Sequence, residues 1–160
     1  MKNLLTKNYR TMQLLILGAV LLGLGIFPAV AQAQPSVTNA PGSVDRSTVG
    51  NFTLNVSLGA APADSVCQIV LTPNAALTSL GAVAPVGWSV VVGATTITWT
   101  SVSTPDCLFP LESENFTWNA TAPANGGDYS VAWDLNGGSS SGNFNVHVNQ
   151  PNFTTSTKTV

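Results

Sequence analysis

The sequence predicts an all-β protein, an antiparallel β-sandwich of about eight or nine strands. The segment Gly126–Val148 alternates apolar and polar residues on either side of a glycine- and serine-rich turn, as half-buried antiparallel strands do. Similar short segments recur at intervals of roughly 8–15 residues, separated by turn-forming residues. Beyond the amino-terminal region, no segment sustains the period of a helix.

The first 33 residues (1–33) are predicted to be a cleavable signal peptide. Basic residues precede an apolar run, Leu14–Ile26, and Ala31-Gln32-Ala33 supplies the small–x–small site of a signal peptidase. The run is shorter than the ~20 residues that span a bilayer, so a retained anchor is the weaker alternative. A pilin-type leader is a second alternative, but Arg10-Thr11-Met12-Gln13 does not resemble its cleavage site. We therefore expect a secreted or cell-surface protein.

The mature chain would begin at Gln34, with an extended lead-in over 34–50, a sandwich domain over 51–150 and a polar tail over 151–160. It carries two basic and seven acidic residues, a net charge of −5. Nucleic acids and anionic membranes are recognised by clustered Lys and Arg, so neither is expected as a partner. No membrane span is expected after processing.

The strands are expected in segments whose apolar residues alternate or run together between turns. A short edge strand is also considered within the lead-in, and one segment is ambiguous between strand and loop. The expected strands are Ser43–Thr48 (edge), Asn51–Leu58, Val66–Thr72 (central), Leu77–Val83 (ambiguous), Trp88–Val92, Thr96–Ser101, Phe116–Thr121 and the two halves of Gly126–Val148.

Cys67 and Cys107 are the only cysteines, and both belong to the mature chain. An even number of cysteines in an exported domain predicts a disulfide, with two free buried thiols as the alternative. A structural zinc site is not expected, because two cysteines and the single histidine, His147, fall short of four ligands.

The segment Asn125–Trp133, NGGDYSVAW, resembles a strand entry of immunoglobulin-like and fibronectin-type-III-like domains in prokaryotic surface proteins. The resemblance implies that Tyr129 packs at a corner between the two sheets. Segments containing Trp88, Trp99 and Trp118 also resemble such export domains, and the likeness covers most of Asn51–Val148. Copper-associated YcnI-like domains are similar as well, but they bind metal through a mature amino-terminal histidine. Gln34 occupies that position here, so neither copper nor any other cofactor is expected.

The four tryptophans are expected to fill the core, because each lies in register with apolar residues of an alternating strand. They are Trp88, Trp99, Trp118 and Trp133. Tyr129 and Trp133 are expected at the core and its corner. The alternative is that exposed tryptophans form a stacking platform for a sugar ring, and Trp88, which follows a turn, is the first candidate.

Five Asn-x-Ser/Thr sequons are candidate glycosylation sites, and they lie on the expected outward faces of strands or in the tail. They are Asn51, Asn55, Asn115, Asn119 and Asn152. The alternative is that the motif occurs by chance in strands rich in Asn and Thr.

No residue pattern requires catalysis or a metal. Asp134–Ser140 has part of a calcium loop's spacing but lacks its glycine and glutamate, so a hairpin turn is the better interpretation. The neighbours Glu112 and Glu114 do not face one another across a cleft as glycosidase carboxylates do. His147 is expected to be solvated, and no serine lies in a nucleophile-elbow sequence. We therefore do not expect an enzyme.

These observations together predict an exported, non-catalytic structural or adhesive module. Its expected partners are copies of itself, surface proteins or polysaccharides. A sharper hypothesis is a filament in which Gln34–Thr48 or Asn152–Val160 is donated as a strand to a neighbouring subunit. The alternative is a carbohydrate-binding module that uses Trp88. A hydrolase is a remote third hypothesis and would need a cleft that joins His147 to Asp128 or Asp134.

Overall fold

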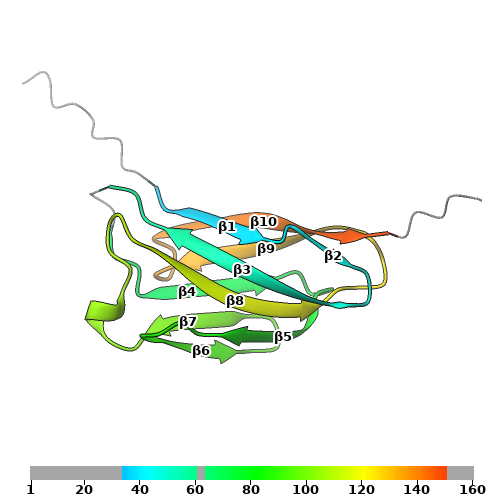
Figure 1. Cartoon of the computed structure of the whole chain (residues 1–160), viewed down its shortest axis with the longest axis horizontal. Coiled ribbons are helices and arrows are strands. Elements are labelled where there is room, and N and C mark those ends of the chain that lie inside the picture. Colours follow the sequence, from blue (N-terminus) through cyan, green and yellow to red (C-terminus); the bar gives the residue numbers. More distant parts are fainter. Residues whose placement is uncertain (1–33, 61–63, 151–160) are drawn as a thin grey trace, which may run out of the picture. The chain divides into compact units, whose positions relative to one another are not determined.

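The computed structural model describes residues 34–60 and 64–150, which form two β-sheets packed face to face (Figure 1). The four-stranded sheet has the order β1 (Ser36–Ala40), β3 (Val49–Ser57), β8 (Ser113–Thr121) and β5 (Thr78–Val83). The six-stranded sheet has the order β2 (Ser43–Asp45), β10 (Ser140–Asn149), β9 (Gly127–Leu135), β4 (Gln68–Pro73), β7 (Ile97–Ser101) and β6 (Trp88–Val92). A single 3₁₀ turn, η1 (Thr104–Asp106), interrupts the loop before β8.

The core lies between the two sheets and is built from every second residue of the long strands. On β3, Phe52, Leu54 and Val56 are buried, and they face buried residues of β4, β7, β9 and β10 in the other sheet. No residue with a polar or charged side chain is buried among the described residues. Burying an aliphatic or aromatic side chain stabilises a fold by about 1.5–3 kcal/mol, so the alternation seen in the sequence decides which face turns inward.

The strand order is that of an immunoglobulin-like sandwich, which confirms the predicted fold class. Such domains place their strands A, B, E and D in one sheet and C, F and G in the other. Here β1, β3, β8 and β5 take the positions of A, B, E and D, while β4, β9 and β10 take those of C, F and G. Strands β7 and β6 extend the second sheet beyond β4, as the hairpin predicted from the sequence.

The predicted corner residue supports the same assignment. The Tyr129 hydroxyl near the start of β9 donates a hydrogen bond of 2.8 Å to the backbone carbonyl of Asn125. A tyrosine at the start of strand F, bonded to the backbone a few residues upstream, is a hallmark of immunoglobulin domains. The bond closes the turn that leads from one sheet into the other.

The lead-in is part of the sandwich, so the domain begins at Ser36 and the boundary predicted at Asn51 falls inside β3. Strand β1 pairs with β3 along its whole length, and β2 then crosses over to pair with β10. Val37 and Val44 turn inward against the core, which explains why these short strands are held. The β2–β10 pair is parallel, whereas all other paired strands described are antiparallel.

The other predicted strands appear with small shifts at their ends. The apolar segment at Val66–Thr72 forms β4, which lies between β9 and β7 and is therefore central, as predicted. The ambiguous segment Leu77–Val83 forms β5, an edge strand with a register shift between Thr78 and Gly81. The predicted signal peptide and the polar tail lie outside the described residues. Within the described part of the chain, no helix is long and apolar enough to cross a membrane.

Candidate functional site

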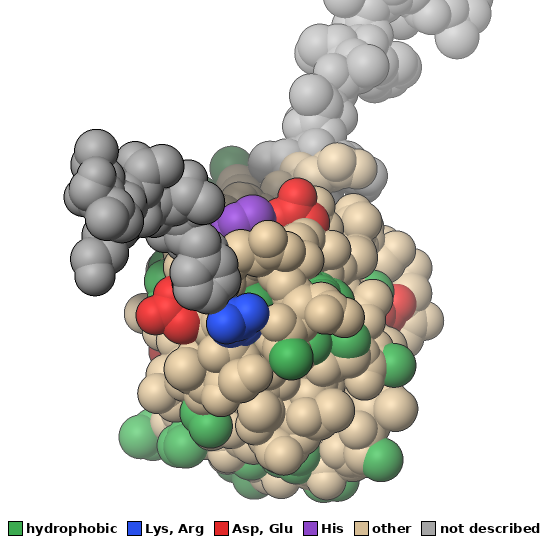
Figure 2. Space-filling view, turned by 90° about the vertical axis from the view of Figure 1, so that its right-hand side faces the viewer, with side chains coloured by type: hydrophobic (Ala, Val, Ile, Leu, Met, Phe, Trp, Pro, Cys, Tyr) green, Lys and Arg blue, Asp and Glu red, His purple; other side chains and the backbone are tan. Residues whose placement is uncertain are grey.

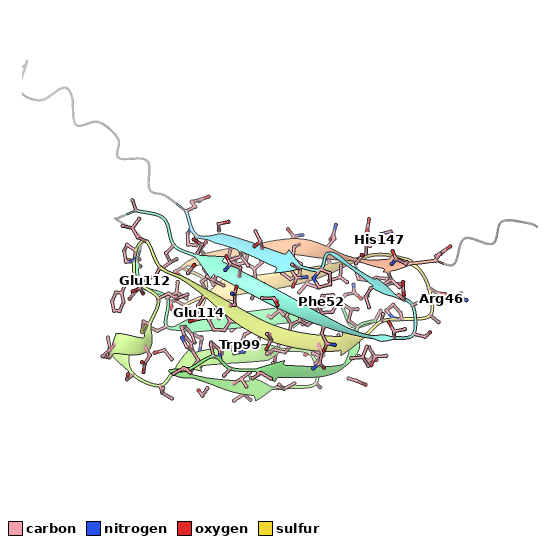
Figure 3. The ribbon with its side chains drawn as sticks, viewed as in Figure 1. Arg46, Phe52, Trp99, Glu112, Glu114 and His147 are labelled. Atoms are coloured by element: carbon pink, nitrogen blue, oxygen red, sulfur yellow. A yellow bond between two sulfur atoms is a disulfide. The ribbon has the colours of Figure 1, made fainter. Side chains whose placement is uncertain are left out.

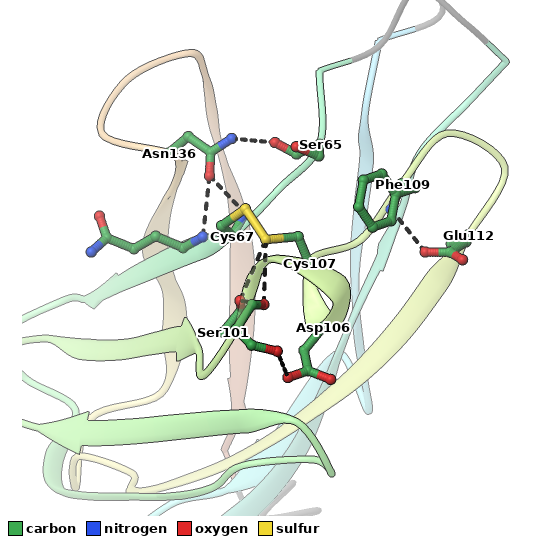
Figure 4. Close-up of a disulfide and its surroundings, with 10 residues drawn as sticks. Ser65, Cys67, Ser101, Asp106, Cys107, Phe109, Glu112 and Asn136 are labelled. Carbon is green, nitrogen blue, oxygen red and sulfur yellow. Dashed lines mark hydrogen bonds between the residues drawn. A yellow bond between two sulfur atoms is a disulfide. The ribbon is translucent and has the colours of Figure 1, made fainter.

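The predicted disulfide joins Cys67, just before β4, to Cys107, just after η1 (Figure 4). Next to it, Val66 and Leu108 form an isolated β-bridge whose two N–H···O=C bonds are 2.8 and 2.9 Å long. The disulfide and the bridge together tie the long loop before β8 to the six-stranded sheet. The disulfide predicted between the two cysteines is confirmed, and such a cross-link is typical of exported domains.

Asn136 completes this cross-link in a way that the sequence did not reveal (Figure 4). Its Oδ1 accepts hydrogen bonds from the backbone N–H groups of Cys67 (2.8 Å) and Gln68 (3.1 Å). Its Nδ2 donates to the carbonyl of Ser65 at 2.6 Å. The backbone of Asn136 adopts a φ of 50°, which asparagine tolerates better than most residues. The only signal in the sequence was its place in an Asn-Gly-Gly turn.

That turn, between β9 and β10, confirms the hairpin interpretation of Asp134–Ser140. Gly137 and Gly138 have φ values of 67° and 103°, which favour glycine. The Asp134 carboxylate accepts a hydrogen bond from the Gly138 N–H at 2.7 Å, so it caps the turn. Among the described residues, no group of three or more His, Cys, Asp or Glu side chains is placed to hold a metal ion.

The tryptophans line the core, as expected, and these include Trp88, the first candidate for the alternative sugar-stacking role. Trp88 is only 8% exposed and packs edge to face on Phe116, with ring centroids 4.9 Å apart. Its place on β6 turns the ring inward, so the alternative stacking role considered for Trp88 is not supported. Trp99 and Trp118 are also buried, at 0% and 1% exposure.

Trp133 is half-buried on the inner face of β9 and packs against the core. Its cross-strand partner on β10 is Gly142, where a Cβ atom, if one were added, would lie 2.6 Å from the indole Cζ2. The indole therefore lies against the β10 backbone, in the space that any larger residue at position 142 would occupy.

The sequons of β3 and β8 fall opposite one another on the outer face of the four-stranded sheet. Asn51 pairs with Asn119, and Asn55 pairs with Asn115, whose Oδ1 accepts a hydrogen bond of 2.8 Å from Asn55 Nδ2. Directly opposed side chains have Cβ atoms about 4.5–5.5 Å apart, so two bulky glycans would compete for the same space. The fifth sequon, at Asn152, lies outside the described residues.

The same outer face is polar and carries little charge. Serine, threonine and asparagine side chains follow one another across β1, β3 and β8, for example Thr38, Asn55 and Asn115 in one row. At its β5 side, a hollow of about 180 Å³ is lined in part by Asn51, Thr53, Thr117 and Asn119. Such a face offers hydroxyl and amide groups to a partner without selecting for its charge.

His147 and Asp128 form an exposed pair on neighbouring strands. The distance between His147 Nδ1 and Asp128 Oδ1 is 2.7 Å, and the two side chains are 55% and 63% exposed. Figure 2 shows the histidine at the surface beside an acidic side chain. Ser43 lies next to His147 in the sheet register, but no hydrogen bond joins these two described side chains. Asp134 is engaged in the turn at the other end of β9.

The remaining candidate carboxylates lie far from this pair. Figure 3 places Glu112 and Glu114 at the opposite end of the sandwich from His147. Glu112 Oε2 accepts a hydrogen bond from the Phe109 N–H, and Glu114 Oε1 accepts one from the Asn115 N–H, both at 2.8 Å. Both carboxylates thus stabilise local backbone. The described structure does not bring these carboxylates together with His147 around one reacting centre.

The described sandwich has four edge strands, β1 and β5 in one sheet and β2 and β6 in the other. Exposed valines lie on the edge strands β5 and β6 or in the loop that joins them. With their exposed fractions, they are Val83 (67%), Val86 (99%), Val91 (70%) and Val92 (40%). In Figure 2, apolar side chains are seen at the lower side of the molecule, where β5 and β6 lie in Figure 1. Edge strands expose unpaired backbone groups that can accept another strand.

Comparison with known proteins finds similar structures but no family. No family model matches the chain, and no curated protein matches it. An uncharacterised Nocardia farcinica protein with an immunoglobulin-like fold is 16% identical, over 74% of this chain and 85% of that one, with a TM-score of 0.46.

Two further solved structures have named roles. The major pilin subunit BcpA of Bacillus cereus is 9% identical, over 72% of this chain and 40% of that one (TM-score 0.47). The chitin-binding domain of Chi18aC from Streptomyces coelicolor is 17% identical, over 66% of this chain and 91% of that one (TM-score 0.38). At such low similarity, the fold assignment rests on strand order and the tyrosine corner.

Proposed function

We propose that the protein is an exported, non-catalytic structural or adhesive module of the cell surface or extracellular material. The observation that carries the proposal is that both edges of each sheet in the described sandwich are open. Open edges accept strands from neighbouring molecules, and this is how several β-domains assemble or bind extended partners. The disulfide supports an oxidising compartment outside the cytosol.

The finer part of the proposal is that the module assembles by donating a strand from its carboxyl-terminal tail. Of the two tails considered from the sequence, Gln34–Thr48 already supplies β1 and β2 to its own sandwich. Donation of the lead-in would first have to break those pairings. Asn152–Val160 is separated by two residues from Asn149, the end of the last strand, and is rich in threonine, which favours extended backbone. We therefore assign the donor role to this tail.

The neutral outer face of β3 and β8 supports the adhesive side of the same proposal. Its side chains are mostly hydroxyls and amides, which can hydrogen-bond to a surface polymer without requiring a charged partner. This face lies on the opposite side of its sheet from the core, so binding there leaves the edges free.

Electron microscopy of the native extracellular fraction, together with purified protein, tests the proposal. We expect ordered assemblies from mature protein that contains residues 34–160, and their loss from a variant that ends at Gln150. The variant keeps every described strand, and its circular dichroism and unfolding midpoint serve as the control for folding. Mature protein that stays monomeric at high concentration, and behaves identically without its tail, would contradict tail donation.

A further inference from the structure

The four edge strands are not equally protected against pairing with another chain. Prolines flank β1 on both sides, at Pro35 and Pro41. Strand β2 is only three residues long and ends in a charged residue, Asp45. Strand β5 is broken by its register shift and by Ser79, whose φ is 52°. Short length, proline, charge and bulges are the devices by which natural sheets block edge pairing.

Strand β6 carries none of these devices. Its sequence, WSVVV, has neither charge nor proline, and it pairs with β7 without interruption from Trp88↔Ser101 to Val92↔Ile97. Valine is among the residues that favour extended strands most. A regular, uncharged and valine-rich edge is the type of segment that accepts a further strand.

The hydrogen bonds of the β6–β7 hairpin show which backbone groups are free. The Gly93 N–H donates to the Thr96 carbonyl (2.7 Å), and the Val102 N–H donates to the Gly87 carbonyl (2.9 Å). Because bonded and non-bonded pairs alternate in an antiparallel ladder, Ser89 and Val91 bond to β7. Val90 and Val92 therefore direct their N–H and C=O groups to the open edge. The Trp88 N–H is already bonded to the Pro85 carbonyl at 3.1 Å.

We propose that β6 pairs antiparallel with β6 of a second copy, about a two-fold axis at Val90. The two Val90 residues exchange both of their backbone hydrogen bonds, and the Val92 N–H of each copy donates to the Trp88 carbonyl of the other. A six-stranded sheet thus continues from one copy into the next. On the outer face, the exposed Val91 of each copy lies opposite Ser89 of the other, so Val91 is a surface residue at the centre of the contact.

Charge does not oppose this contact. Asp106 lies beside Gly87 at the start of the strand, and Glu112 and Glu114 line the same hollow as Trp88. All three carboxylates lie at the Trp88 end of β6, so in an antiparallel pair those of the two copies fall at opposite ends of the contact. The same surface patch serves both copies, as a two-fold interface requires. The contact does not use the tail, so it goes beyond the proposed function.

The test compares two substitutions of exposed valines on different edges, made in the full mature chain. Val91→Lys places a lysine on β6, and Val83→Lys places one on β5, where the native side chains are 70% and 67% exposed. Sedimentation velocity over a concentration series should show a dimer for the native protein. We expect Val91→Lys to raise the dimer dissociation constant at least roughly tenfold and Val83→Lys to leave it nearly unchanged.

Hydrogen exchange provides a second readout at single amides. On raising the protein concentration, the amides of Val90 and Val92 should become protected, while that of Trp88 should not change. Protection at β1 or β5 instead, equal weakening by the two lysines, or a native protein that remains monomeric would overturn the β6 contact. A dimer that disappears when the tail is removed would show that the tail, not β6, is the partner strand. Tail donation is tested separately, by whether the variant ending at Gln150 still forms ordered assemblies.

Discussion

At the scale of single residues, two polar side chains stabilise this sandwich at points where the chain changes direction. Tyr129 closes the turn that leads into β9. Asn136, just after the other end of β9, is hydrogen-bonded to the backbone at the start of β4. Both act on backbone groups that have no ladder partner at that position. Their contribution is therefore the satisfaction of loop hydrogen bonds rather than the filling of the core.

The substitution Tyr129→Phe tests the corner bond. It removes the hydroxyl that donates to the Asn125 carbonyl at 2.8 Å and keeps the ring that packs on the core. A single hydrogen bond of this kind contributes about 1 kcal/mol, so the free energy of unfolding should fall by about that amount. Urea unfolding followed by tryptophan fluorescence measures it. An unchanged midpoint would show that water replaces the bond without loss.

Asn136→Ala should be more damaging, because it removes three hydrogen bonds and places alanine at a φ of 50°. We expect a loss of about 2–4 kcal/mol. Asn136→Gly is the matched control: it loses the same bonds but tolerates the left-handed backbone, so it should retain about 1 kcal/mol more. The same urea titration measures both variants. Equal stability of the two would exclude a backbone contribution.

At the scale of elements, the cross-link between the loop before β8 and the start of β4 is the main tie outside the sheets. The two cysteines are 40 residues apart in the sequence. Closing a loop of that length stabilises a fold by roughly 4 kcal/mol in the chain-entropy model. The neighbouring Val66–Leu108 bridge and the hydrogen bonds of Asn136 stabilise the same region by non-covalent interactions.

The double substitution Cys67→Ala with Cys107→Ala should therefore lower the unfolding free energy by roughly 2–5 kcal/mol. Thermal unfolding of this variant and of the native protein, each with and without a reducing agent, measures the effect. Reduction should lower the melting temperature of the native protein and leave that of the variant unchanged. A native protein insensitive to complete reduction would contradict a stabilising role for the cross-link.

Most strands could be predicted from the sequence because alternation over five or more residues leaves little ambiguity. Strands β3, β6, β7, β9 and β10 are of this kind. Strand β1 was not predicted, because a single inward valine, Val37, between two prolines gives no periodic signal. It is held by tertiary contacts, namely the pairing with β3 and the hydrogen bond of 2.9 Å from Trp118 Nε1 to Asn39 Oδ1.

At the scale of the whole molecule, the fold class followed from the sequence, whereas the candidate contact surfaces did not. The identity of an edge strand depends on sheet order, which joins segments far apart in the chain, as β4 with β9. The hairpin of β6 and β7 was expected, but only the strand order leaves β6 without a neighbour. The burial of Trp88 could not be decided from the sequence for the same reason. Trp88 follows a turn and begins an edge strand, and the alternating pattern alone does not show whether such a residue is covered by the other sheet.

The crossing of the chain from β1 to β2 has a mechanical consequence. Because β2 runs parallel to β10, the chain enters this pair at Ser43 and leaves it near Asn149, at the opposite end of the contact. Tension between the two ends of the domain would slide these strands past one another rather than peel them apart. In sliding, the bonds of the pair share the load and must break together, whereas in peeling they would fail one by one. The parallel β2–β10 pair would therefore resist tension applied between the two ends of the domain.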